Sequence, residues 1–442
     1  MSIIENKEQL INYFISGIKK KEQLRIGVEH EKFLFHGDDK KRATYDHVKT
    51  IFKNLETFGW KPFYEKENVL GLTRGEQKIT LEPGLQYELS GAPLKNIHLV
   101  CSESSAHFKE IKQAAKNLDI YTASVGFDPF NKLEEAPKNP KKRYQIMTEE
   151  MPKGGELSLQ MMYQTSGIQI NLDYTSESNF EKIFKVTNYL APLTIAIFAN
   201  SPFVNRKFSG YLSYRNKVWQ NTSRGGIMPL AFEKITFEKY IDQAINYSLL
   251  FLMKEDEYIS PNGQTFKDFM DGNFKPLKGL KPTIKDFENH LGTIFTEARL
   301  KQFVEIRTLD TCDWNCICNG PAFFTGLIYG SLDEAYDIIK HWKKEDILNA
   351  YLSSTQKGLD AEIGNKKLLE WGKVFLSLAK KGLEKRNELN SKNNNETIYL
   401  KHIEDILDRK KNRAQLLLEQ FNEKGNLEFF NYNNEDFSYS GF

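Results

Sequence analysis

The sequence of 442 residues contains only four cysteines, Cys101, Cys312, Cys316 and Cys318. A disulfide framework would be far too sparse for a chain of this length, so we expect free thiols and a reducing, cytoplasmic location. The first ten residues also lack the basic segment and apolar run of a secretory signal. The three clustered cysteines follow a CxxxCxC spacing without a second ligand pair, which disfavours a zinc site.

Neither a long apolar run nor an excess of one charge is present. The longest apolar stretch, residues 189–199, is far shorter than the roughly 20 residues of a membrane span. The 61 basic and 59 acidic side chains leave a formal net charge of +2, which provides no basic field for nucleic acid. We therefore expect no membrane and no nucleic-acid partner, and a composition of 40% hydrophobic residues indicates a globular protein with a large core.

Two common nucleotide-binding motifs are missing. The sequence has no GxxxxGK[ST] loop and no GxGxxG fingerprint after a strand. The segment MPKGG at 151–155 has glycines and a lysine but not the spacing that a phosphate loop requires. Any nucleotide phosphates would therefore have to be held by metal ions and arginines.

Helical and strand-like patterns mix irregularly along the chain, which predicts an α+β fold. Apolar residues recur with helical spacing at 107–118, 180–198, 332–342, 368–383 and 399–421. Strand-like runs occur at 24–35, 78–90, 167–174 and 302–309, and we expect long connections between them rather than two-residue turns. The polar stretch at 387–395 is expected to form a loop between the last two long helices.

Carboxylates recur on one face of the strand-like runs. Glu29 and Glu31 are two residues apart, which in a strand places both on the same face, about 6.6 Å apart along the backbone. Glu82 and Glu88 flank a Pro-Gly interruption at 83–84, so a bent or bulged strand could present both carboxylates to the same cavity.

The other two runs have the same design. Gln169 and Asn171 alternate with apolar residues in one run, and Glu305 and Arg307 share the polar face of the other. Each run alone is explained by a face turned to water. Solvated faces, however, favour Lys, Thr and Ser, whereas this set holds five glutamates, two amides and an arginine. Converging carboxylates need hard cations to neutralise them, so the set predicts a cavity that binds Mg²⁺ or Mn²⁺.

The segment YLSYRNKVWQNTSR at 211–224 places Arg215 and Trp219 four residues apart. On a helix or turn this spacing sets a guanidinium beside an aromatic wall, an arrangement suited to a substrate carboxylate. A surface arginine stacked on a tryptophan explains the same spacing. Both interpretations remain open at this stage.

Taken in order, these motifs resemble the glutamate–cysteine ligases of the plant and proteobacterial type. The resemblance runs through GVEHEKF, the segment 71–98, RYQIM, SLQMMYQTSGIQINLDY, ANSPF, SYRNKVW and VEIRTLD. It implies a mostly antiparallel sheet, related to that of glutamine synthetase, which curves into a funnel with helices packed outside. It also implies a single catalytic domain over residues 1–442, with a helical C-terminal part from about residue 332.

The resemblance also implies an activity and its reactants. Such an enzyme uses ATP as a co-substrate and joins the γ-carboxyl of L-glutamate to the amine of L-cysteine through a γ-glutamyl phosphate. This is the first step of glutathione biosynthesis. It implies Mg²⁺ or Mn²⁺ as the metal, L-glutamate, L-cysteine and ATP as the small-molecule partners, and a monomer or homodimer.

Site roles follow by motif position. The resemblance implies catalytic roles for Arg307, beside the reacting phosphate, and for Glu82. Substrate contacts are expected from Arg215, Trp219, Gln169 and Asn171. The metal ligands are expected to be the carboxylates of Glu29, Glu31, Glu82, Glu88 and Glu305.

Two features bear on how far the resemblance can be carried over to this chain. After Trp219 the family continues with an acidic run, whereas residues 220–224 carry no acid, so a same-fold ligase that joins glutamate to a different amine acceptor stays open. Cys101 and Cys318 fall at cysteine-bearing positions of plant relatives that regulate by disulfide formation, but a sequence does not determine the pairing. A non-enzymatic regulator on a decayed scaffold is disfavoured, because all five glutamates are present.

Overall fold

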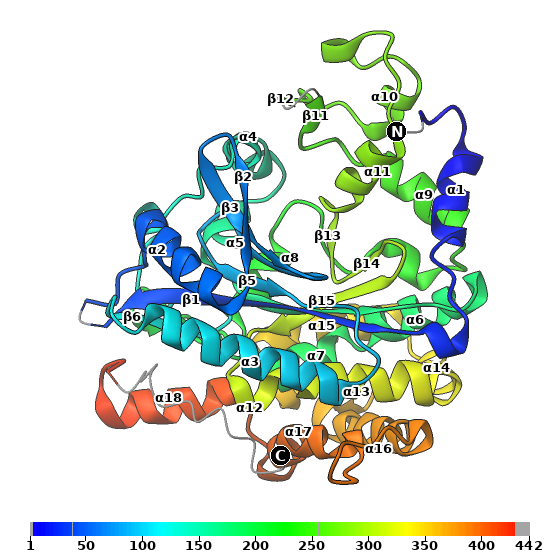
Figure 1. The fold of residues 1–442 in the computed structure, drawn as a ribbon. Coiled ribbons are helices and arrows are strands. Elements are labelled where there is room, and N and C mark those ends of the chain that lie inside the picture. The colour runs from blue at the N-terminus through cyan, green and yellow to red at the C-terminus, as the bar shows by residue number, and fades with distance from the viewer. Residues whose placement is uncertain (1–2, 38, 255–256, 429–442) are drawn as a thin grey trace.

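A large antiparallel sheet forms the centre of the computed structural model, which describes residues 3–37, 39–254 and 257–428 (Figure 1). Within these residues its nine strands run in the order β14-β15-β7-β1-β5-β4-β3-β2, with β6 beside β1, and neighbouring strands in it are antiparallel. The strands are β1 (Ile26–His36), β2 (Lys61–Glu65), β3 (Asn68–Arg74), β4 (Gln77–Leu81), β5 (Tyr87–Ser90), β6 (Ile120–Ala123), β7 (Gly167–Leu172), β14 (Ala298–Leu300) and β15 (Val304–Asp310).

The sheet is curved, since β2 and β3 stand up from the part formed by β1 and β15 (Figure 1). The predicted α+β fold with a mostly antiparallel curved sheet is therefore confirmed. Four short two-stranded pairs lie outside it: β8 (Phe203–Val204) with β9 (Lys207–Phe208), β10 (Gly225–Gly226) with β13 (Phe295–Thr296), β11 (Leu252–Lys254) with β12 (Glu257–Ile259), and β16 (Glu362–Ile363) with β17 (Lys366–Lys367).

One face of the sheet is covered by helices, and the main core lies between the two layers (Figure 1). Ile168, Ile170 and Leu172 of β7 point into this core, as do Val304 and Ile306 of β15, and all are fully buried. This face follows from strand alternation, because every second residue points the same way. The covering helices are α3 (Ile97–Ala115), α6 (Glu177–Tyr189), α7 (Ala191–Phe198), α13 (Asn319–Thr325), α14 (Leu332–Ile339), α16 (Leu368–Arg386) and α17 (Lys401–Arg409).

The remaining helices flank the sheet or pack at its ends. They are α1 (Lys7–Ile15), α2 (Tyr45–Leu55), α4 (Lys142–Glu150), α5 (Ser158–Gln164), α8 (Tyr214–Gln220), α9 (Phe237–Ile245), α10 (Phe266–Met270), α11 (Ile284–Leu291), α12 (Trp314–Ile317), α15 (Lys344–Lys357) and α18 (Arg413–Lys424). In the described part of the chain, no helix has both the length and the apolar character that crossing a membrane requires.

Several predicted elements are divided in the structure. The expected helix at 180–198 breaks into α6 and α7, where Pro192 occupies the first turn of α7. The expected helix at 399–421 breaks at Lys410, whose φ of 57° is left-handed. The expected strand at 78–90 becomes β4 and β5, joined by a turn that contains the Pro-Gly pair.

The connections between the four predicted strand-like runs are long, as expected, but the prediction missed the strands β2 and β3 of the sheet. β2, β3 and β4 follow one another through two-residue turns at 66–67 and 75–76. Each turn starts with a left-handed residue, Lys66 with a φ of 54° and Gly75 with a φ of 59°. The polar loop expected at 387–395 is confirmed, because α16 ends at Arg386 and Asn387 is left-handed.

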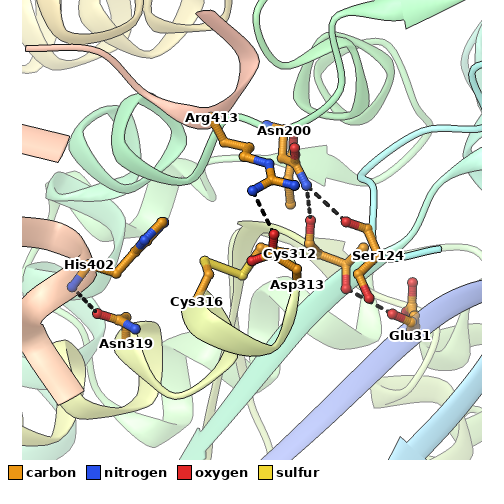
Figure 2. Close-up of a disulfide and its surroundings, with 11 residues drawn as sticks. Glu31, Ser124, Asn200, Cys312, Asp313, Cys316, Asn319, His402 and Arg413 are labelled. Carbon is orange, nitrogen blue, oxygen red and sulfur yellow. Dashed lines mark hydrogen bonds and ion pairs between the residues drawn. A yellow bond between two sulfur atoms is a disulfide. The ribbon is translucent and has the colours of Figure 1, made fainter. Parts of the chain in front are cut away.

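The expectation of free thiols was also wrong. Cys101 of α3 forms a disulfide with Cys318, and Cys312 forms one with Cys316, with Cα–Cα distances of 5.9 and 5.7 Å. Figure 2 shows the second disulfide just after β15, beside an ion pair of Asp313 with Arg413 at 2.6 Å. The sequence could not reveal the first pairing, because only the packed fold brings two cysteines 217 residues apart together.

Candidate active site

A cavity of about 360 Å³ lies over the polar face of the sheet. Most of the predicted site residues line it: Glu29, Glu31, Glu82, Glu88, Gln169, Trp219 and Arg307. The strand register brings them together, because Glu31 pairs with Glu88 across β1 and β5, and Glu29 pairs with Gln169 across β1 and β7. Glu305, Arg215 and Asn171 are not among the lining residues.

Glu31 is half-buried among groups of both signs. Burial raises the pKa of its carboxyl to about 7, and the neighbouring Glu82 carboxylate adds to the rise, whereas Arg215 opposes it. The carboxylate accepts hydrogen bonds from Gln169 Nε2 at 2.8 Å and from the backbone amide of Gly167 at 2.7 Å. Its position is thus fixed by two donors while its charge is disfavoured.

Glu88 lies in the same crowded set of acids. Burial, followed by the charges of Glu82, Glu29 and Glu31, raises the pKa of its carboxyl well above its ordinary value. Thr80 Oγ1 donates to it at 2.6 Å. Repulsion between these carboxylates favours their protonated forms, and a bound cation would offset that repulsion. The group of carboxylates therefore suits a positively charged ligand.

The acids do not form a ready-made metal cage. Within the described residues, no three His, Cys, Asp or Glu side chains are close enough together to hold a metal ion on their own. The carboxylates are instead distributed around the cavity wall. This arrangement fits Mg²⁺, which usually keeps several waters and binds through one or two carboxylates together with substrate phosphates.

Glu305 occupies a different environment from the other predicted ligands. Its carboxylate pairs with Arg299 through Nη2 at 2.7 Å, with Lys301 Nζ at 2.9 Å, and with Arg307 Nη1. Burial alone would raise the pKa of Glu305, but these three cations hold it well below its ordinary value. The structure therefore places Glu305 in an ion-pair cluster, and its role as a metal ligand stays a prediction.

Arg215 and Trp219 lie one turn apart on α8, beside Arg307. The Trp219 ring centre is 5.3 Å from Arg215 Cζ and 5.1 Å from Arg307 Cζ. The interpretation as a surface arginine is wrong, since Arg215 is only 1% exposed. Its Nη2 donates to the Arg307 carbonyl at 3.0 Å, while Nε and Nη1 have no hydrogen-bond partner among the residues that the structure describes. Two buried donors, on different edges of the guanidinium, thus remain for an anion.

Asp310 explains why α8 stands at this end of β15. Its carboxylate accepts hydrogen bonds from Ser201 Oγ at 2.6 Å, from Asn200 N at 2.8 Å and from Ser213 Oγ at 2.8 Å. Ser213 is the N-cap of α8. The motifs ANSPF, SYRNKVW and VEIRTLD therefore meet at one buried acid, for which sequence reasoning had assigned no role.

Other lining residues were also missed. Lys141 and Arg143 face the cavity, and burial together with the charge of Arg143 lowers the pKa of Lys141 to about 8. Arg299 and Lys301 also line the cavity. The RYQIM motif contains Arg143, so its sequence signal was available, whereas a short hairpin strand gave no signal for Arg299.

The same fold occurs in a solved ligase. The chain is similar to the crystal structure of glutamate–cysteine ligase from Francisella tularensis in complex with AMP, with a TM-score of 0.53 and 13% identity. The match covers 96% of this chain and 91% of that one. At this low identity the likeness shows that the two proteins share a fold.

Sequence comparisons then identify the family. The model of glutamate–cysteine ligase family 2 matches residues 25–431. The chain is 37% identical over 424 residues to a chloroplastic glutamate–cysteine ligase of Solanum lycopersicum, covering 95% of this chain and 80% of that protein. It is 38% identical to glutamate–cysteine ligase B, chloroplastic, of Oryza sativa subsp. japonica, covering 95% and 84%. The chain belongs to the glutamate–cysteine ligase family, and the resemblance drawn from its motifs is confirmed.

Proposed function

We propose that this protein uses ATP to join the γ-carboxyl of L-glutamate to the amine of L-cysteine, and so carries out the first step of glutathione biosynthesis. The observation that carries the proposal is the cavity itself, whose lining combines the four predicted acids Glu29, Glu31, Glu82 and Glu88 with the buried Arg299 and Arg307 in a member of this family. The names of the plant relatives support the same reaction.

The chemistry follows from the weakness of a carboxylate as an electrophile. Attack of the glutamate γ-carboxylate on the γ-phosphoryl of ATP gives γ-glutamyl phosphate and releases ADP. The cysteine amine then attacks the acyl carbon, loses a proton and displaces inorganic phosphate. Arg307 would offset the charge that spreads over the phosphoryl oxygens. Its guanidinium is held in place by Glu305 and lies against Trp219. Positioning and electrostatics then suffice, with no covalent protein nucleophile.

Glutamate would bind at the end of the cavity near α8. Arg215 lies behind the lining, next to Trp219, and its Nε–H or Nη1–H would donate a single charge-assisted hydrogen bond to the α-carboxylate. Gln169 and Asn171 donate through their amide nitrogens to Glu31 and Glu29, at 2.8 and 3.0 Å. Their buried carbonyl oxygens, Oε1 and Oδ1, have no partner in the described part of the chain and suit the α-ammonium group.

A divalent cation would be held by the carboxylates of the cavity wall, Glu29, Glu31, Glu82 and Glu88. When bound, Mg²⁺ or Mn²⁺ supplies charge neutralisation for the triphosphate. The positive side chains of Lys141, Arg143, Arg299 and Lys301 in the cavity lining add to this. A monomer or homodimer and a cytoplasmic location remain our predictions.

The alternative of a different amine acceptor has lost the observation behind it. None of residues 220–224 lines the cavity. Arg224 donates instead to Ser248 Oγ at 2.8 Å and to Thr293 Oγ1 at 3.1 Å, and Gln220 donates to the Tyr351 carbonyl at 2.7 Å. The departure from the family pattern thus lies outside the lining of the site.

A coupled assay tests the proposal directly. ADP release should require L-glutamate, L-cysteine and Mg²⁺ or Mn²⁺ together, and mass spectrometry should identify γ-glutamylcysteine as the product. A panel of other amines at equal concentration serves as the control. Steady-state ADP release that is equally fast without cysteine, or equal turnover with an unrelated amine, would contradict the proposal.

A further inference from the structure

The turn that carries Glu82 lies between β4 and β5 and is held from outside the sheet. Within the turn, the Glu82 amide donates to the Gln86 carbonyl at 3.0 Å, and Leu85 has a left-handed φ of 55°. Gly84 approaches the end of α5 so closely that a Cβ there would lie 2.3 Å from the Tyr163 carbonyl oxygen. The position of Glu82 therefore depends on how the turn and α5 are joined.

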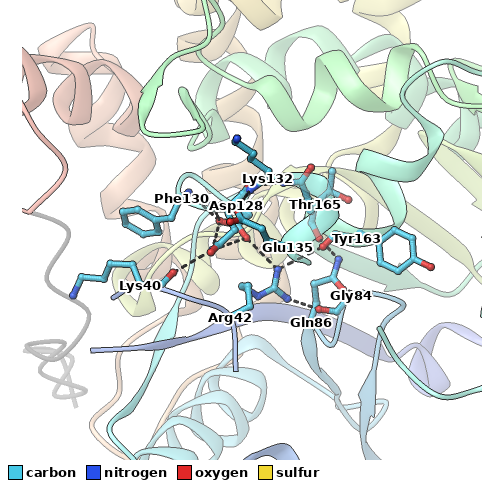
Figure 3. Close-up of polar contacts among 12 residues, drawn as sticks. Lys40, Arg42, Gly84, Gln86, Asp128, Phe130, Lys132, Glu135, Tyr163 and Thr165 are labelled. Carbon is cyan, nitrogen blue, oxygen red and sulfur yellow. Dashed lines mark hydrogen bonds and ion pairs between the residues drawn. The ribbon is translucent and has the colours of Figure 1, made fainter. Parts of the chain in front are cut away.

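Arg42, in the connection after β1, joins them (Figure 3). Its guanidinium donates to the Gly84 carbonyl and, at 3.5 Å, to the Tyr163 carbonyl. Asp128 pairs with it at 3.4 Å, and the two side chains are 1% and 0% exposed. One planar cation thus links the turn to the helix, and a buried acid balances its charge.

Arg42 itself stays behind the cavity wall. The lining includes Glu82 and Gln86 of the turn, and Met162 and Thr165 at the end of α5, but not Arg42. Gln86 forms a parallel link, because its Nε2 donates to the carbonyls of Met162 and Thr165 at 3.1 and 2.8 Å. Any effect of Arg42 on the site must therefore pass through the position of these lining residues.

We propose that Arg42 is a positioning residue, which sets the placement of Glu82 relative to Glu29, Glu31 and Glu88 and thereby the affinity of the cavity for a divalent cation. The proposal rests on the proposed function, in which Glu82 is a ligand. Lysine has the same charge but no planar fork, so it cannot bond Gly84, Tyr163 and Asp128 together. Arg42→Lys should therefore loosen the turn without adding a buried unpaired charge.

The test measures Mn²⁺ binding to the full chain by electron paramagnetic resonance, with activity as a second readout. Arg42→Lys should weaken Mn²⁺ binding by about tenfold or more, as for other residues that orient metal ligands. The Mg²⁺ concentration for half-maximal rate should rise in parallel, while KM for L-glutamate changes little. Arg386→Lys is the matched control. Arg386, at the end of α16, pairs with Glu396 at 3.2 Å, so this substitution should change the melting temperature but not Mn²⁺ binding.

Each outcome has a defined meaning. A folded Arg42→Lys variant that binds Mn²⁺ like the unmodified protein would overturn the role of Arg42. If that variant does not fold, Asp128→Asn, which keeps the guanidinium and weakens its anchor, takes its place with the same two outcomes. An unmodified protein that binds no Mn²⁺ would instead overturn the metal role in the proposed function.

Discussion

At the scale of single residues, Glu82 gives the sharpest test of the carboxylate set. Glu82→Gln removes a ligand charge and hardly changes the side-chain volume. We expect ligation to fall by about a hundredfold with little change in Tm, since metal-site substitutions cost this much. Product formation and thermal melting measure the two effects. Glu76→Gln, in the exposed turn after β3, is the control, and near-normal turnover of Glu82→Gln would remove Glu82 from the ligands.

Arg307 tests the phosphoryl role in the same way. Arg307→Lys keeps the positive charge but loses the planar donors that reach Glu305 and lie against Trp219. We expect kcat to fall by about a hundredfold, with KM for glutamate nearly unchanged, because the lost contact belongs to the transition state. Steady-state kinetics provide the measurement, with exposed Arg206→Lys as the control. Full activity would show that the phosphoryl role is wrong.

Glu31 makes the metal-free protein sensitive to pH. Its pKa is raised to about 7 in the folded state, chiefly by burial, from an ordinary value of 4.5. The folded state therefore binds more protons than the unfolded state between these values, and stability should fall as the pH rises through this window.

A divalent cation binds the deprotonated carboxylate, so the increase in Tm caused by Mn²⁺ should be larger at pH 8 than at pH 6. Melting curves with and without Mn²⁺ at several pH values measure this difference. Glu31→Gln should flatten the dependence. An equal increase at every pH would show that Glu31 does not titrate with metal binding.

At the scale of elements, two glycines control the packing of α16 beneath the sheet. A Cβ at Gly382 would lie 1.9 Å from the Gly326 carbonyl oxygen, and a Cβ at Gly326 would lie 2.2 Å from that of Ala379. Gly382→Ala should therefore lower the free energy of unfolding by about 1 to 3 kcal/mol through overpacking. Denaturant unfolding measures the loss. Exposed Lys380→Ala on the same helix should be nearly neutral, and unchanged stability of Gly382→Ala would contradict the tight contact.

The sequence predicted elements well where a simple period governed them. Alternation in β1, β7 and β15 identified both the buried and the polar faces, because a strand side chain has only two directions to take. It could not identify Arg299 or Lys141, which reach the cavity from short segments without a period. The break at Lys410 was missed for another reason, since helical apolar spacing continues on both sides of a left-handed residue.

At the scale of the whole molecule, the disulfide of Cys101 and Cys318 closes a very long loop between α3 and the start of α13. Chain-entropy arguments make such a link stabilising by about 2 to 4 kcal/mol under oxidising conditions. Cys101→Ser should therefore lower Tm, and dithiothreitol should remove the difference. Cys316→Ser, which opens a link between residues only four apart, is the matched control. Equal losses for both variants would contradict an effect of loop length.

The arrangement of the whole molecule could be predicted only in part from the sequence. The family resemblance supplied the antiparallel sheet, whereas the convergence of distant glutamates was inferred from the residue types on the polar strand faces. The disulfides show what local patterns cannot predict. Which of the four cysteines pair depends on which helices become neighbours in the fold. The same holds for Glu305, because no sequence pattern indicated its pairing with Arg299 and Lys301.

The use of both faces of one sheet has a consequence for how such a protein can change. Odd-numbered residues of β7 carry the chemistry, and the even-numbered ones between them carry the core. Substitutions that change substrate choice and substitutions that change thermal stability can therefore accumulate at alternating positions of the same strand without affecting each other. A mutational library confined to the odd-numbered positions would sample new reactivity while the core residues stay unchanged.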